Sequence, residues 1–198
     1  MIRLYRAPYS TNVERVALAL AHKGLQAESV WIDYGDRSEV ERVSGQGLVP
    51  VIDDGGTVVA DSTTILEYLE GRCPERPLYP ADPARREETR VFIDWFDEVW
   101  KQWPNGIEAD PSRTGELAAR MAAALDRFEA LLAGRPYLMG GDVSAADFVA
   151  FPFLKYATFR DPEDDELFHR ILDEQQSLTD AHPRLAGWIE RVNALPRV

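Results

Sequence analysis

Ser10 is the first residue of this sequence whose type and position suggest chemistry. It opens the run Ser10-Thr11-Asn12 directly before an apolar pattern with helical spacing, so it lies at or beside a helix start. The unpaired N–H groups and the dipole of a helix N-terminus favour a bound anion. Ser10 or Asn12 can equally be a plain N-cap, which is the more common use of these residue types. The residues by themselves leave both interpretations open.

In two further segments, a proline or a pair of polar residues stands at the start of a predicted strand or helix. Pro50 stands at the start of an apolar run that is typical of a strand, where its missing N–H costs the sheet one hydrogen bond. The simplest interpretation is a trans proline at a strand edge. Asp61 and Ser62 stand where the next helical pattern begins. They can hold a charged ligand at the helix start or simply cap the helix.

The other reactive residue types form no recognisable site. The three histidines are not at metal-ligand spacing, so we expect no metal, and neither a His-Glu-x-x-His nor a Gly-x-Ser-x-Gly motif occurs. The single cysteine, Cys73, follows a helical segment and precedes a proline. We interpret it as a small buried or half-buried residue rather than a nucleophile.

The composition narrows the class of protein. The chain has 198 residues, 45% hydrophobic and 28% charged, which suits one ordinary domain or two small ones. Its net charge of −12 argues against nucleic acid or anionic lipid as a partner. One cysteine cannot form an internal disulfide, and we find no targeting segment or membrane span, so we expect a cytoplasmic protein. Lysine is rare among the 22 basic residues, a bias typical of GC-rich bacterial genomes.

Periodicity and turn signals predict the elements that position these residues. The first part reads β-α-β-α-β-β-α, an α/β unit. Its predicted strands cover 2–6, 29–32, 48–52 and 57–60, and its helices cover 13–20, 36–43 and 62–69.

The composition changes after this unit. Four prolines fall within ten residues, so we predict a first domain over 1–72, a linker over 73–83 and an all-helical domain over 84–198. The predicted helices cover 84–103, 114–133, 144–156, 165–178 and 183–195. Pro104-Asn105-Gly106 is expected to end the first of them, whose aromatic residues are mostly core. Ser144 and Asp147 form a capping box, which we interpret as structural.

Four motifs occur in a fixed order along the chain. They are Ser10-Thr11-Asn12-Val13-Glu14-Arg15-Val16 with Lys23-Gly24, Gly47-Leu48-Val49-Pro50-Val51-Ile52, Asp61-Ser62-Thr63-Thr64-Ile65-Leu66-Glu67-Tyr68-Leu69, and Tyr137-Leu138-Met139-Gly140-Gly141-Asp142-Val143-Ser144-Ala145-Ala146-Asp147. Together with a final Pro183-x-Leu185-x-x-Trp188 helix, they resemble the cytosolic glutathione transferase superfamily, serine-type, over nearly the whole chain.

The resemblance implies a fold and an activity. The fold is a thioredoxin-like α/β domain with a mixed four-stranded sheet, followed by an all-α domain that holds a small hydrophobic electrophile. The activity is conjugation of the glutathione thiolate to that electrophile, as in detoxification, with glutathione as co-substrate. A homodimer is also implied.

The resemblance also assigns roles to five residues. Ser10 is the catalytic position and donates a hydrogen bond to the thiolate. Val49 pairs its N–H and C=O with the glutathione backbone next to a cis Pro50. Asp61 accepts from the γ-glutamyl ammonium, and Ser62 holds the carboxylate.

Departures from the family pattern keep other functions open. Leu48 stands where a Gln or Lys is usual, and neither Arg37 nor Arg42 is a clear partner for the glycyl carboxylate. The alternatives are a glutathione-dependent isomerase or dehalogenase, a non-catalytic relative whose thiol site has decayed, and use of another small thiol.

Overall fold

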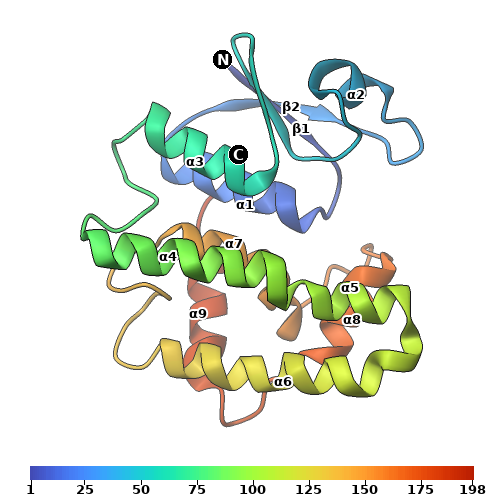
Figure 1. Cartoon of the computed structure of the whole chain (residues 1–198), viewed down its shortest axis with the longest axis vertical. Coiled ribbons are helices and arrows are strands. Elements are labelled where there is room, and N and C mark those ends of the chain that lie inside the picture. The colour runs from blue at the N-terminus through green and yellow to red at the C-terminus, as the bar shows by residue number, and fades with distance from the viewer. The chain divides into compact units, whose positions relative to one another are not determined.

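The computed structural model describes residues 1–198, and the chain forms two compact units (Figure 1). Met1–Tyr79 and Leu195–Val198 make the first unit, and Pro80–Ala194 makes the second. We expected residues 195–198 in the helical domain. They belong to the first unit because the Val198 N–H donates to the Ala17 carbonyl (3.4 Å) and Arg197 pairs with Glu14.

The first unit is built on a four-stranded mixed sheet, as predicted, in the order β2-β1-β3-β4. The strands are β1 (Ile2–Arg6), β2 (Ala27–Trp31), β3 (Val51–Asp54) and β4 (Thr57–Ala60), and β1 is parallel to β2 and antiparallel to β3. The predicted strand 48–52 begins later than expected, because Pro50 has no N–H to donate to a ladder. It also extends to Asp54, since Gly55 and Gly56 (φ 62° and 101°) make a turn of only two residues.

Helices cover both faces of this sheet. The three helices are α1 (Thr11–His22), α2 (Ser38–Ser44) and α3 (Ser62–Arg72). Tyr5 and Val51 pack against Val40 of α2. Because side chains alternate along a strand, Leu4 and Ile52, both fully buried, face the opposite side, where α1 and α3 lie next to each other (Figure 1).

A buried lysine fastens the segment after α3 to α1. The Lys23 side chain has no exposed area, and its Nζ lies 2.9 Å from the Glu70 carboxylate and 2.6 Å from the Cys73 carbonyl. Nζ also donates to the Arg76 carbonyl (3.3 Å), so part of the proline-rich segment is tied down rather than loose.

We expect Lys23→Met to lower the free energy of unfolding by about 3 kcal/mol, because it leaves the Glu70 carboxylate without its buried partner. Urea unfolding measures the loss. Arg120→Met is the matched control, because Arg120 pairs with Glu116 on the exposed surface of a helix, where a pair contributes about 0.5 kcal/mol. Equal unfolding midpoints for the two variants would contradict the prediction.

The second unit is entirely helical, as predicted. Its helices are α4 (Pro83–Trp95), α5 (Gln102–Ala109), α6 (Thr114–Leu131), α7 (Ala145–Leu154), α8 (Leu167–Gln175) and α9 (Pro183–Asn193). Every residue of α7 is buried, so this helix is the centre of the unit. None of the helices combines the length and the hydropathy that a membrane crossing requires.

The single long helix predicted over 84–103 is wrong. It is two helices, α4 and α5, separated by a π-helical turn over Phe96–Trp100. Pro104-Asn105-Gly106 does not end a helix either. Pro104 lies in the first turn of α5, where a missing N–H costs nothing.

Candidate functional site

The segments that carry the five predicted site residues begin or end at one edge of the sheet. Tyr5 near the end of β1 pairs with Val51 at the start of β3, and Val51 pairs with Ala60 at the end of β4. The loop to Ser10 leaves β1 at this edge, Val49 and Pro50 enter β3 there, and Asp61 and Ser62 follow β4 there. The topology therefore brings together three segments whose outermost residues, Ser10 and Ser62, are 52 positions apart in sequence.

Ser10 is the N-cap of α1. Its Oγ accepts from the Val13 N–H (3.4 Å), and its carbonyl accepts from the Glu14 N–H (3.0 Å). A hydroxyl that accepts one hydrogen bond still has its own proton to donate. The capping role and a role as donor to an anion are therefore compatible. Tyr9, directly before it, has a φ of 56°, a left-handed conformation that is rare for a non-glycine residue and frequent at functional sites.

The Val49–Pro50 peptide bond is cis, as the resemblance implies. Pro50 is buried and Val49 half-buried, and neither the N–H nor the C=O of Val49 is hydrogen-bonded to another part of the chain. Leu48 is 67% exposed. Its main chain is held on both sides by Gln46, whose Oε1 accepts from the Leu48 N–H and whose Nε2 donates to the Leu48 carbonyl.

Of the two arginines considered for a carboxylate, only Arg37 lies against this segment. Its Nη1 donates to the Gly47 carbonyl (3.0 Å), two residues before Val49, and its guanidinium lies 5.3 Å from the ring centroid of Tyr34. Arg42 is exposed on α2.

Asp61 and Ser62 form the start of α3. The Asp61 carboxylate caps the helix by accepting from the N–H (2.9 Å) and the hydroxyl (3.0 Å) of Thr64, and it remains exposed. Asp61 has a φ of 72°, again left-handed. The Ser62 hydroxyl is buried and accepts from Nη1 of Arg15 (3.3 Å).

Arg15 was not singled out from the sequence. It is fully buried in α1, and its hydrogen bond to Ser62 connects α1 to the N-terminus of α3. Its positive charge adds to the dipole of α3 and favours an anion at that end of the helix. The run Val13–Leu20 contains two charged residues, Glu14 and Arg15, among apolar ones, and this was the available signal.

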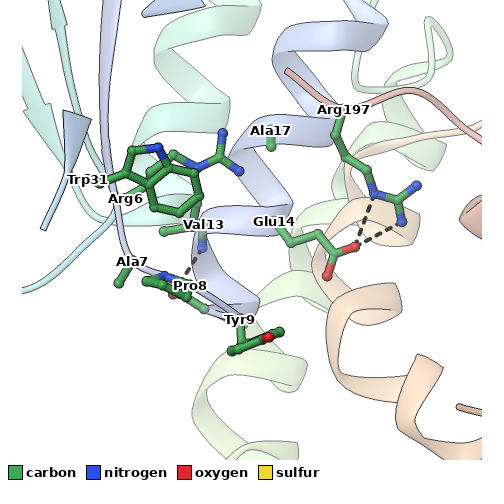
Figure 2. Close-up of a pocket in the computed structure, with 10 residues that line it drawn as sticks. Arg6, Ala7, Pro8, Tyr9, Val13, Glu14, Ala17, Trp31 and Arg197 are labelled. Atoms are coloured by element: carbon green, nitrogen blue, oxygen red, sulfur yellow. Dashed lines mark hydrogen bonds and ion pairs between the residues drawn. The ribbon is translucent and has the colours of Figure 1, made fainter. Parts of the chain in front are cut away.

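A small pocket lies beside Ser10 within the first unit (Figure 2). It has a volume of about 180 Å³ and is lined by Ser10, Arg6, Tyr9, Trp31, Glu14 and Arg197, together with small apolar residues. Val49, Pro50, Asp61 and Ser62 do not line it. Burial lowers the pKa of the Arg6 guanidinium, and the nearby Glu14 carboxylate opposes this effect. No group of histidine, cysteine and acidic side chains is arranged to hold a metal ion.

Two domain families match this chain. Residues 4–77 match the N-terminal domain of glutathione S-transferases, and residues 83–191 match their C-terminal domain. The chain therefore belongs to the glutathione transferase superfamily, and its first unit is the thioredoxin-like domain of that fold.

Individual relatives are distant. Glutathione S-transferase L3 of Arabidopsis thaliana is 27% identical over 96% of this chain and 77% of its own length. FtsZ-localized protein A of Caulobacter vibrioides is 30% identical over 74% of this chain and 73% of its own. A Sulfitobacter glutathione transferase homologue, solved with bound glutathione, superposes with a TM-score of 0.75 at 22% identity, covering 98% of this chain and 93% of its own.

Proposed function

We propose that this protein is a glutathione transferase that binds glutathione at the edge of the sheet where Ser10, Val49 and Asp61–Ser62 meet. The convergence of these three segments in a chain of this superfamily carries the proposal. Val49 offers an unpaired N–H and C=O to the peptide backbone of glutathione, as an added strand would. Asp61 receives the γ-glutamyl ammonium, and the N-terminus of α3, with Ser62 and Arg15 behind it, holds the γ-glutamyl carboxylate.

Ser10 supplies the step that activates the thiol. A free thiol has a pKa of about 8.5, so only a few per cent is thiolate at pH 7. A hydrogen bond from the Ser10 hydroxyl and the N-terminus of α1 stabilise the thiolate. Lowering the thiol pKa by about two units requires roughly 2.7 kcal/mol. One charge-assisted hydrogen bond of about 1.5–3 kcal/mol, with up to about 1 kcal/mol from the helix terminus, supplies that amount. The thiolate sulfur then forms a bond to the electrophilic carbon, and the leaving group departs with the electron pair of the bond that breaks.

Two measurements test this function. Calorimetric titration of the protein with glutathione, and in parallel with other small thiols, identifies the thiol; we expect saturable binding of glutathione. Conjugation of 1-chloro-2,4-dinitrobenzene then tests catalysis. Binding without conjugation would favour a non-catalytic relative. Absence of heat at ~1 mM glutathione would contradict the proposal, because even a weak complex with a Kd near that concentration would be detected.

Arg37 is the best-placed partner for the glycyl carboxylate of glutathione. We expect Arg37→Gln to raise the Kd for glutathione about five-fold, equivalent to about 1 kcal/mol for a part-exposed ion pair. Arg42 lies on α2, the helix that begins directly after Arg37, and is exposed, so Arg42→Gln should leave the Kd within a factor of two. The result is read by calorimetry, and equal effects of the two substitutions would exclude this assignment.

We also propose that the protein is a homodimer through the helical unit. An open apolar groove of about 820 Å³ runs beside α4 and α6 and is lined by Val91, Phe92, Trp95 and Leu131. Val91 is 66% exposed there. We expect light scattering to report a dimer for the wild type and a monomer for Val91→Glu. Val99→Glu changes another exposed valine, outside this groove, and should remain dimeric.

A further inference from the structure

Glu14 is the one acidic residue of α1, and it lies close to Ser10. The two residues are four positions apart, so they share a face of the helix, and both line the pocket shown in Figure 2. A carboxylate in the first turn stabilises a helix through its dipole. The thiolate of the proposed function forms at the same helix end. Glu14 therefore favours the helix but opposes that second anion, because like charges disfavour each other.

Arg197, from the segment after α9, pairs with this carboxylate. Its Nε and Nη2 lie 3.1 and 2.9 Å from the same Glu14 oxygen, as the dashed lines in Figure 2 mark. The Arg197 and Glu14 side chains are only 25% and 16% exposed. Salt and water screen a partly buried pair much less than a surface pair. The guanidinium therefore compensates most of the field of Glu14 at close range.

The main chain around Arg197 holds this side chain in place. Its Nη1 donates to the Leu195 carbonyl (2.7 Å), and the Val198 N–H donates to the carbonyl of Ala17, one turn beyond Glu14 in α1 (3.4 Å). All of these residues belong to the first unit. The positive charge beside Glu14 is thus fixed by the fold rather than carried by a loose side chain.

The pocket has two other titratable groups, Arg6 and Tyr9. Arg6 directs its hydrogen bonds to the Ser29 hydroxyl (3.2 Å) and the Val198 main-chain oxygen (2.9 Å). Burial lowers the pKa of Arg6, and the Glu14 carboxylate acts against this effect. The charge of Glu14 is therefore felt by another group that lines the same pocket as Ser10.

We propose that Arg197 compensates the charge of Glu14 and so prevents this carboxylate from opposing the thiolate that forms at Ser10. Arg197 acts through Glu14, so it is a positioning residue and not a catalytic one. The inference deepens the proposed function and rests on it. The alternative is a purely structural role, in which the pair only fastens residues 195–198 to α1.

A thiol introduced at the site reports on this charge without any ligand. Ser10→Cys in a Cys73→Ser background leaves a single thiol in the protein, and the pH dependence of its alkylation by iodoacetamide gives its pKa. A full charge about 8 Å away shifts a pKa by about 0.4 units in water and by about 1.5 units at an effective dielectric constant of about 20. We therefore expect Arg197→Gln to raise the pKa of this reporter thiol by about 0.5–1 unit.

The direction of each shift separates charge from structure. Glu14→Gln should lower the pKa of the reporter thiol, because it leaves the Arg197 charge uncompensated. The double substitution should return the pKa to within about 0.3 units of its starting value. Loss of a structural contact would instead move both single variants in the same direction and leave the double variant shifted. That result, or an unchanged pKa in Arg197→Gln, would overturn the proposal.

Arg3→Gln is the matched control. It also removes one positive charge from the first unit, but Arg3 pairs with Glu28 on the surface and does not line the pocket. Because exposed charges are screened, we expect the pKa of the reporter thiol to change by less than about 0.3 units.

Glutathione itself gives the second measurement. The pKa of bound glutathione, followed by the ultraviolet absorbance of its thiolate in protein that retains Ser10, should shift in the same directions as the reporter thiol. A bound thiol that ignores both substitutions would overturn the inference. Absence of binding would contradict the proposed function, while the reporter thiol still decides whether Arg197 compensates Glu14. The opposite sign expected for Glu14→Gln keeps the test decisive if Arg197→Gln is poorly folded.

Discussion

Replacement of Ser10 by alanine is expected to lower kcat for conjugation, measured at saturating glutathione and pH 7, about twenty-fold. If the site lowers the thiol pKa by about two units, roughly three quarters of the bound glutathione is thiolate at pH 7. Without the stabilising hydrogen bond the pKa returns towards about 8.5, and only about 3% is thiolate. The deficit shrinks as the pH rises, because above about pH 9 the thiol ionises without help. A pH–rate profile of wild type and variant measures both the size of the loss and its disappearance.

The N-cap role of Ser10 makes a second variant necessary. Alanine also removes the hydrogen bond to Val13, which costs about 1 kcal/mol of stability. Ser10→Asp retains a good cap for α1 but places a carboxylate where the thiolate forms. We expect it to unfold at about the wild-type midpoint and to lose at least as much activity as Ser10→Ala. Equal activities of wild type and both variants would exclude a role for Ser10 in thiol activation.

The order of elements was predictable from sequence because local signals agree with the tertiary fold in this chain. Alternation marks the strands, Gly55-Gly56 marks the hairpin, and all-helical periodicity follows the proline-rich segment. The break between α4 and α5 was not predictable. The helical pattern of apolar residues continues through residues 96–100, and this segment contains no glycine or proline that would signal the π-helical turn there. Pro104 was therefore expected to end a helix, although it lies in the first turn of α5.

The residues of the candidate site were predictable only where the neighbouring sequence marks the start or end of a helix or strand. Ser10, Pro50, Asp61 and Ser62 each stand at the end of an element, and such positions can be read from sequence. Arg15, Arg6 and Arg197 were missed because their relevance depends on long-range contacts. Arg15 meets Ser62 forty-seven positions away, and Arg197 meets Glu14 across 183 positions. No periodicity signals contacts of that range.

The capping box of α7 is the feature whose loss should destabilise the helical unit most. Asp147 is fully buried and accepts four hydrogen bonds. Its Oδ1 accepts from the Leu138 N–H (2.9 Å) and the Trp188 indole N–H (2.8 Å). Its Oδ2 accepts from the Ser144 N–H (2.8 Å) and hydroxyl (2.9 Å). One carboxylate therefore joins the loop before α7, the start of α7 and the middle of α9.

We expect Asp147→Ala to lower the free energy of unfolding by about 3–5 kcal/mol, because it leaves several buried donors without an acceptor at once. Ser144→Ala removes only the cap hydroxyl and should cost about 1 kcal/mol. Asp142→Ala is the matched control: it removes an exposed carboxylate from the same loop and should change the stability by less than about 0.5 kcal/mol. Urea unfolding of the three variants gives the order. An Asp147→Ala variant within about 1 kcal/mol of the wild type would mean that water replaces the carboxylate, and that this network does not hold the helical unit together.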